Sequence, residues 1–291
     1  MDEMIPPKRV FPAAREDAEV ANRPSPLPQT QSPAYKLAFQ DIDFLLRGDL
    51  RPVRFQLELL KPDLLLEEAG IASTFVFYGS ARIPEPEKAD ALIAAAGTET
   101  QRAIAERLKA KSKYYEEARK LARLASQADP DREGGRHFVV CSGGGPSIME
   151  AANRGAHDAG QHSVGLNIVL PHEQVPNPYV TPELSFQFHY FALRKMHFLL
   201  RARAVAVFPG GFGTLDESLE LLTLVQTGKV KPIPILFFGR EFWERAIDFE
   251  FLVAEGVIAV DDLKLFHFAE TAEEGWDHVC AWYEGSDETP C

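Results

Sequence analysis

Residues 204–217 read AVAVFPGGFGTLDE, and their pattern is the most informative in the chain about its architecture. The apolar run 204–208 is typical of a buried strand, 209–213 of a glycine-rich turn, and Thr214 of a helix cap. Glycines in such a turn let backbone N–H groups approach an anion, and the helix N-terminus adds partial positive charge. Because the carboxylate of Glu217 follows three residues after the cap, the stretch predicts an anion site beside an acid.

Outward from this stretch, short apolar runs alternate with helical segments. The predicted strands lie at 74–78, 137–141, 163–169, 184–190, 204–208 and 233–238. Helices are expected at about 87–126 with breaks near Gly97 and Lys111, after Pro146, at 191–203 and at 215–226. Strands buried on both faces and separated by helices predict an α/β fold, a three-layer Rossmann-like parallel sheet with helices on both faces.

The composition changes along the chain and predicts three segments. Residues 1–34 contain seven prolines among small and charged residues, which predicts an extended or disordered arm. Residues 35–70 carry apolar side chains at helical spacing, so we expect an N-terminal helical extension that caps the main domain. Residues 71–291 are expected to form the Rossmann-like, nucleotide-binding catalytic domain.

The net charge and the cysteines limit which binding partners and which cellular compartment we expect. The chain has 31 basic and 43 acidic residues, a net charge of −12, which predicts no binding to nucleic acid. No apolar stretch approaches the roughly 18 residues of a membrane span, so no membrane is expected. The three cysteines show no pairing pattern, which favours a cytoplasmic location. The histidines lack ligand spacing, so no metal is expected.

Two further glycine-bearing turns follow predicted strands, at 79–82 and at 142–146. The carboxyl ends of parallel strands meet at one edge of the sheet, where ligands bind, so we expect the three turns to share a crevice. In the second turn Pro146 fits the first helical position, with Gly145 as the cap. No turn has the sequence of a Walker P-loop, and none fits the dinucleotide fingerprint.

The residues alone leave alternatives open at two places. Glu217 is either a catalytic carboxylate or the last residue of a capping box with Thr214, in which its side chain returns to the cap N–H. In the helix at 191–203, Arg194, His197 and Arg201 share a face. That face is either a solvated basic stripe or a surface from which Arg194 contacts phosphate or sugar.

Taken together, the motifs resemble the Lonely guy (LOG) family of nucleoside 5′-monophosphate phosphoribohydrolases. Members of this family are often mislabelled lysine decarboxylases and include bacterial AMP nucleosidases. The resemblance rests on SGGGPSIMEAAN at 142–153, on Arg194 and Lys195, and on the signature PGGxGTxxE at 209–217, and it extends over residues 75–238. Residues 1–70 look like those of the longer bacterial members.

The resemblance implies hydrolysis of the N-glycosidic bond of a purine nucleoside 5′-monophosphate, AMP or a cytokinin riboside 5′-monophosphate, to free base and ribose 5-phosphate. Arg194 and Glu217 match the family's catalytic pair. The positions that match its substrate contacts are Gly79, Ser80, Gly143, Gly144, Gly145, Glu173, Lys195, Gly210, Gly211, Gly213, Thr214 and Thr223. The resemblance implies no cofactor and a homo-oligomer, a dimer or a larger assembly.

Two rival functions stay open at this point. A non-catalytic nucleotide or cofactor carrier on the same fold would bind a nucleotide without releasing its base. An amino-acid decarboxylase would need pyridoxal phosphate on a lysine. Lys195 lies beside an arginine, and the sequence shows no other sign of such a site.

Overall fold

The computed structural model describes residues 11–22, 26–128, 131–132, 135–171 and 175–284. Its contacts divide the chain into two compact units, Met1–Glu58 and Leu59–Cys291. Within the described residues, no helix is long and apolar enough to cross a membrane. Cys141 is a free, buried thiol. Cys280 is disulfide-bonded although the cysteines show no pairing pattern in the sequence, and Cys291 lies outside the described residues.

The described part of the first unit consists of short helices that bury few side chains. Helices α1 (Ala14–Ala21), α2 (Pro28–Gln31) and α3 (Ile42–Leu45) contain no buried residue. Arg54, in the first turns of α4 (Arg51–Glu68), donates hydrogen bonds to the carbonyls of Leu45 and Arg47, both at 2.7 Å. Helices therefore occupy much of the described part of the arm expected at 1–34. The division of the chain at residues 34 and 70 stays a prediction.

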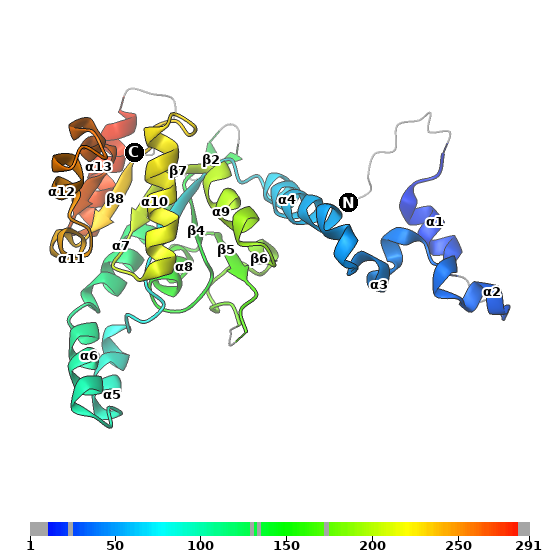
Figure 1. Ribbon diagram of the computed structural model, residues 1–291, viewed down its shortest axis with the longest axis horizontal. Coiled ribbons are helices and arrows are strands. Elements are labelled where there is room, and N and C mark those ends of the chain that lie inside the picture. The colour runs from blue at the N-terminus through cyan, green and yellow to red at the C-terminus, as the bar shows by residue number, and fades with distance from the viewer. Residues whose placement is uncertain (1–10, 23–25, 129–130, 133–134, 172–174, 285–291) are drawn as a thin grey trace. The chain divides into compact units, whose positions relative to one another are not determined.

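The second unit is built on a seven-stranded sheet of order β6-β5-β4-β1-β7-β8-β9, in which every neighbouring pair is parallel (Figure 1). The strands are β1 (Thr74–Tyr78), β4 (Val139–Ser142), β5 (Ser163–Ile168), β6 (Ser185–Phe188), β7 (Ala202–Val207), β8 (Ile235–Phe238) and β9 (His267–Ala269). A separate hairpin joins β2 (Asp131–Arg132) to β3 (Gly135–Arg136). The predicted α/β fold is confirmed, and β9 is a strand that the sequence reading missed.

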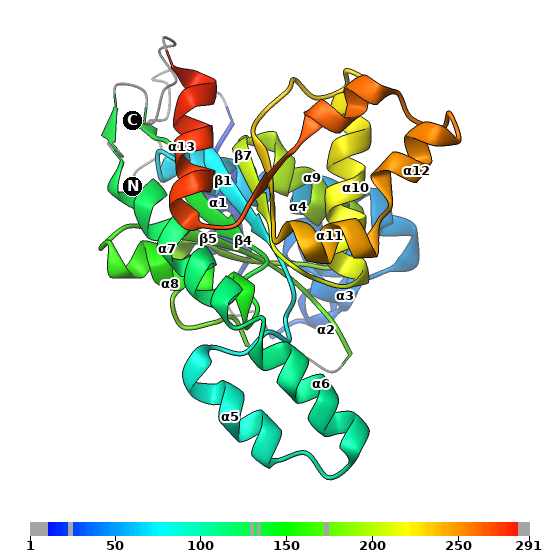
Figure 2. The same ribbon diagram turned by 90° about the vertical axis from the view of Figure 1, so that its left-hand side faces the viewer.

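Side chains that alternate along the strands pack against helices on the two faces of the sheet. Phe75 and Phe77 of β1 point into the core formed with α7 (Lys113–Gln127), α8 (Ile148–Asp158) and α13 (Ala272–Tyr283). Tyr78 points to the opposite face, where its ring meets Phe198 of α9 (Phe191–Leu200) edge-on. That face is also covered by α10 (Phe212–Gln226) and α11 (Arg240–Ala246), as Figure 2 shows. Helix α12 (Phe249–Ala254) follows α11 along the chain.

The small-residue stripe of α8 lets this helix approach its neighbours closely. Ala151, Ala152 and Ala156 are fully buried. A Cβ atom at Gly155 would overlap the backbone carbonyl of Arg119 in α7, so a side chain does not fit there. The close contact fixes the position of α8 and of the glycine turn that precedes it.

The long helical segment predicted at 87–126 is three helices, with the breaks where they are expected. Helices α5 (Pro86–Ala94) and α6 (Glu99–Lys109) form a hairpin that extends from the sheet (Figure 2), and α7 follows. Thr98 caps α6 by accepting a hydrogen bond from the Gln101 N–H at 3.2 Å. The Gln101 side chain in return accepts hydrogen bonds from the N–H groups of Gly97 and Thr98. These bonds complete a capping box at the start of α6.

Candidate active site

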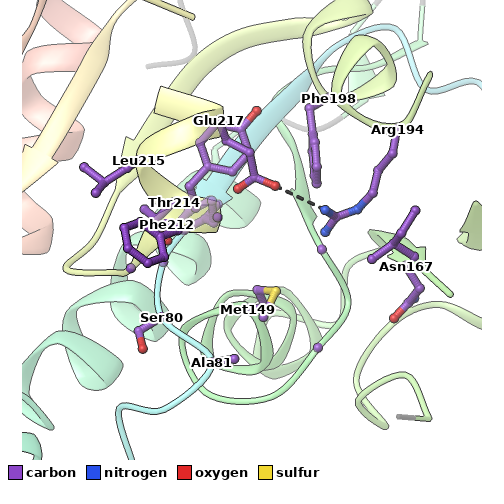
Figure 3. A pocket seen from close by; sticks show the side chains of 18 of the residues that line it. Ser80, Ala81, Met149, Asn167, Arg194, Phe198, Phe212, Thr214, Leu215 and Glu217 are labelled. Atoms are coloured by element: carbon purple, nitrogen blue, oxygen red, sulfur yellow. Dashed lines mark hydrogen bonds and ion pairs between the residues drawn. The ribbon is translucent and has the colours of Figure 1, made fainter. Parts of the chain in front are cut away.

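A cavity of about 630 Å³ lies at the carboxyl ends of the central strands (Figure 3). This volume is within the range of small-molecule sites. Strand β1 lies between β4 and β7, and the chain runs outward from β1 in both directions, so the cavity lies where the strand order reverses. All three glycine turns contribute lining residues, namely Gly79–Ser80, Gly143 with Gly145, and Gly211 with Gly213 and Thr214.

The turn after β1 is hydrogen-bonded to both neighbouring turns. The Ser80 N–H donates to the carbonyl of Pro209 at 3.1 Å, and the Ser80 carbonyl accepts from the Ile148 N–H at 3.4 Å. A Cβ atom at Gly79 would lie 2.5 Å from the Ile148 side chain, which explains the glycine. The three turns are therefore one connected structure.

A buried polar network holds the turn after β4. The Ser142 hydroxyl accepts from the Gly144 N–H at 3.0 Å and donates to Asn153 Oδ1 at 2.7 Å. Asn177 Nδ2 donates to the same Asn153 oxygen at 2.9 Å and to the Gly145 carbonyl at 3.0 Å. The sequence reading missed both asparagines. The available signal was a polar residue, Asn153, among the small residues Ala151, Ala152, Gly155 and Ala156.

The helix after this turn starts later than predicted. Gly145 is not its cap and Pro146 is not its first residue, because Ser147 is the cap and α8 begins at Ile148. Ser147 has φ of 67°, which is uncommon for a residue with a side chain, and its hydroxyl donates to the Ile83 carbonyl. The hydrogen bond from Ile148 to Ser80 places the start of the helix against the first turn.

The helix after β7 starts earlier than predicted. Gly211 is the cap and Phe212 the first residue of α10, so Thr214 is not the cap. The Thr214 side chain is buried against Gly210, where a Cβ atom would overlap it. Glu217 consequently lies in the second turn of α10 and cannot close a capping box. This alternative for Glu217 is wrong.

Arg194 and Glu217 meet at one wall of the cavity, from α9 and α10 respectively (Figure 3). Arg194 Nη1 donates to Glu217 Oε1 at 3.2 Å, and Arg194 Nε donates to the Leu166 carbonyl at 2.7 Å. The guanidinium also lies over the ring of Phe198, 5.0 Å from its centre. A Cβ atom at Gly143 would lie 2.5 Å from Arg194 Nη2, so the second glycine turn leaves room for this arginine.

The Glu217 carboxyl is buried enough to change its protonation. Burial raises the pKa of Glu217 to about 7, although the positive charge of Arg194 opposes the rise. Burial, together with the negative charge of Glu217, raises the pKa of the neighbouring Tyr78 phenol, which stays neutral. Glu217 thus changes charge near neutral pH, as suits a group that takes part in acid–base chemistry.

The basic stripe on α9 is not solvated. Arg194 and His197 are both buried. Arg201 donates to the Asp63 carboxylate at 2.7 Å and to the Ile71 carbonyl at 3.0 Å. The solvated-stripe alternative is therefore wrong, and the stripe faces the protein interior.

The other predicted site residues take different places. Gly144 and Gly210 belong to the turns but do not line the cavity. Lys195 also lies outside the lining, and its ammonium pairs with Asp216 and Glu220 at 3.2 and 3.1 Å. Thr223 is exposed two turns further along α10. Glu173 lies outside the described residues.

Further residues line the cavity that the sequence reading did not name as site residues. They are Phe77, Tyr78, Ala81, Arg82, Met149, Asn167, Ile168, Leu170, Phe191, Phe198, Phe212 and Leu215. Most are apolar and suited to the flat faces of a purine. Within the described part of the chain, no cluster of three or more histidine, cysteine or acidic side chains could hold a metal ion.

Comparisons with known proteins point to one family. A family model described as "Possible lysine decarboxylase" matches residues 149–279. The cytokinin riboside 5′-monophosphate phosphoribohydrolase LOG of Oryza sativa subsp. japonica is 32% identical over 162 residues, 52% of this chain and 65% of that protein. A cytokinin riboside 5′-monophosphate phosphoribohydrolase of Arabidopsis thaliana is 29% identical over 140 residues, 47% of this chain and 63% of that protein.

The chain covers less than two thirds of the length of these two relatives. Among solved structures, a Moco carrier protein from Chlamydomonas reinhardtii is 16% identical with a TM-score of 0.42, over 71% of this chain and 94% of that chain. The resemblance to the Lonely guy family that the motifs indicate is confirmed by the family model and the two curated relatives.

Proposed function

We propose that this chain, with the motifs of the Lonely guy family, hydrolyses the N-glycosidic bond of a purine nucleoside 5′-monophosphate. The substrate is AMP or a cytokinin riboside 5′-monophosphate, and the products are free base and ribose 5-phosphate. The observation that carries the proposal is the buried Arg194–Glu217 pair on the wall of a cavity that three glycine turns also line. The homo-oligomer and the cytoplasmic location stay predictions.

The reaction needs a negative charge beside the sugar. As the bond from C1′ to the base nitrogen breaks, its electron pair leaves with the base and positive charge develops on the ribose ring. The ionised Glu217 stabilises that charge and orients the water whose oxygen bonds to C1′. A proton from this water is then transferred to the departing base. Because the Glu217 side chain is largely buried, its negative charge acts more strongly on the sugar than it would in solution.

Arg194 orients the Glu217 carboxylate for this reaction. Its Nε is committed to the Leu166 carbonyl and its Nη1 to Glu217, so the guanidinium orients one carboxylate oxygen and leaves the other free. The starts of α8 and α10 form the wall that supplies the anion site. The first N–H groups of these helices have no partners within the helices, although the Ile148 N–H is bonded to the Ser80 carbonyl, and both helices begin at glycine turns that line the cavity. A 5′-phosphate suits this wall.

The test is product analysis after incubation with a panel of nucleoside 5′-monophosphates and with adenosine. We expect equal amounts of free base and ribose 5-phosphate from at least one purine monophosphate, and at least about 100-fold lower kcat/KM with adenosine, since the phosphate contacts are lost. Nucleotide binding without release of any base would refute the hydrolase and favour a carrier. Equal rates with AMP and adenosine would refute the phosphate site.

A further inference from the structure

The charges around the cavity leave one cation without a partner. Among the described lining residues, only Arg82, Arg194 and Glu217 carry a formal charge at neutral pH. Arg194 and Glu217 are paired with each other. The side chain of Arg82 has no hydrogen bond or ion pair with any described residue, and it is exposed.

Arg82 differs in this from Arg154 and Lys195, whose side chains are partly buried. The chain has more acids than bases, and nearby cations such as Lys195 and Arg154 are held by carboxylates. A second hollow of about 410 Å³, which Arg82 also lines, contains Glu85 and Glu150.

Those two acids are already engaged. Glu85 pairs with Arg154 at 2.9 Å and also with Lys88, and Glu150 accepts a hydrogen bond from the Tyr115 hydroxyl at 3.0 Å. Among the described residues that line the main cavity, Arg82 is therefore the cation without a side-chain partner.

The backbone of Arg82 is fixed although its side chain is not. Its N–H donates to the Ser80 hydroxyl at 3.0 Å, and the Ser80 N–H donates to Pro209. Arg82 therefore extends from the fastened turn that connects the starts of α8 and α10. Helix N-termini offer N–H donors to a phosphate but only partial charge, whereas a guanidinium offers a full charge and two parallel donors.

We propose that Arg82 binds the 5′-phosphate of the substrate and gives the site its preference for nucleotides over nucleosides. This inference rests on the proposed function, since it names the residue that recognises the phosphate of that substrate. The guanidinium closes over the phosphate from the rim, while the glycine turns hold it from below. The catalytic pair is on the α9 and α10 wall, so Arg82 contributes to binding more than to bond cleavage.

The test compares Arg82→Gln and Arg82→Lys with the matched control Arg107→Gln, which removes the same charge from the exposed face of α6, far along the chain from the turns. The first measurement is the affinity of each full-length variant for ribose 5-phosphate by calorimetry, which does not depend on turnover. We expect Arg82→Gln to lose about 10- to 100-fold in affinity, the usual effect of a charge-assisted hydrogen bond. Arg82→Lys should lose less, and Arg107→Gln should match the wild type.

The second measurement separates KM from kcat with AMP. We expect Arg82→Gln to raise KM by a similar factor while kcat changes by less than about threefold, and to leave kcat/KM for adenosine unchanged. Unchanged ribose 5-phosphate affinity in a folded Arg82→Gln variant, or no affinity in the wild type, would overturn the role of Arg82. If the wild type binds ribose 5-phosphate through Arg82 but releases no base from AMP, the hydrolase proposal fails and the phosphate contact stands.

Discussion

At the scale of single residues, the protonation of Glu217 decides what the site can do. An exposed glutamate would be fully ionised at pH 7, but burial between α9, α10 and the sheet raises the pKa of Glu217 to about 7. Arg194 limits this rise and orients the carboxylate through a hydrogen bond of 3.2 Å. The group is therefore about half ionised in the free protein near neutral pH.

The pH dependence of turnover follows from this pKa. If the ionised carboxylate stabilises the positively charged ribose, kcat/KM for AMP should rise about tenfold per pH unit below pH 7 and level off above it, since kcat/KM reports the free enzyme. Steady-state rates between pH 5 and pH 9 check this. A rate that falls as pH rises through 7 would mean that protonated Glu217 is the active form.

The same pKa makes stability depend on pH. The folded state holds the Glu217 proton up to about pH 7, whereas the unfolded chain loses it near 4.5, so stability is lost as pH rises between these values. Ionisation costs the folded state about 1–3 kcal/mol above pH 7. Glu217→Gln avoids this cost, so its thermal midpoint should exceed that of the wild type by several degrees at pH 8 and match it at pH 5. An equal difference at both pH values would contradict the buried, titrating carboxyl.

At the scale of elements, the site depends on glycines that make room for side chains from other elements. Gly143 lies against the Arg194 guanidinium, Gly79 against Ile148 at the start of α8, and Gly210 against Thr214 in α10. Each glycine thus positions one wall of the cavity relative to another. The sequence predicts that these turns share a crevice, but it does not show which side chain packs against each glycine.

One substitution tests this role of the turns. A methyl group at Gly143 would lie 2.5 Å from Arg194 Nη2, so Gly143→Ala should displace the guanidinium from Glu217. We expect kcat/KM for AMP to fall by about 100-fold or more, because orientation of the pair is lost, with an unchanged circular dichroism spectrum. Gly97→Ala, whose added methyl group makes only ordinary contact with Gln101, serves as the matched control. Full activity in Gly143→Ala would show that Arg194 is not held by this turn.

The helices and strands follow from the sequence better than their ends do. Apolar runs predicted every central strand, and the breaks near Gly97 and Lys111 were correct. The predicted starts of α8 and α10 were wrong. The contact of Ser80 with Ile148, between two turns, and the packing of Thr214 against Gly210, within one turn, outweigh the capping preferences read from the sequence. The Arg194–Glu217 pair could be expected only from the family resemblance. Its geometry depends on α9, which precedes β7 in the sequence, and on α10, which follows it. No local sequence pattern predicts a contact between these two helices.

At the scale of the whole molecule, the two units differ in how much they bury. The described helices α1, α2 and α3 of the first unit have no buried residue, whereas the sheet of the second unit is enclosed between helices. Local opening is therefore expected to be far easier in the first unit. The apolar spacing at 35–70 predicted helices there, in agreement with α3 and α4, but the prolines at 1–34 predicted an extended or disordered arm and not α1 and α2.

Limited proteolysis measures this difference. Trypsin should cut first after basic residues between 11 and 50, such as Lys36 and Arg47, and leave a resistant fragment that contains residues 71–284. Mass spectrometry of the early fragments identifies the cleavage sites. First cuts within the sheet or within α7 to α10 would contradict the assignment of the stable core.

The central claim is that an ionised Glu217 facing this cavity drives release of a base from a nucleoside monophosphate. The most direct measurement is the amount of adenine and ribose 5-phosphate that wild type and Glu217→Gln release from AMP at pH 8, where the wild-type carboxylate is charged. We expect equal amounts of the two products from the wild type and at least about 1000-fold slower release by the folded variant, the loss expected for a charged transition-state contact. Release by the variant at the wild-type rate would contradict the claim.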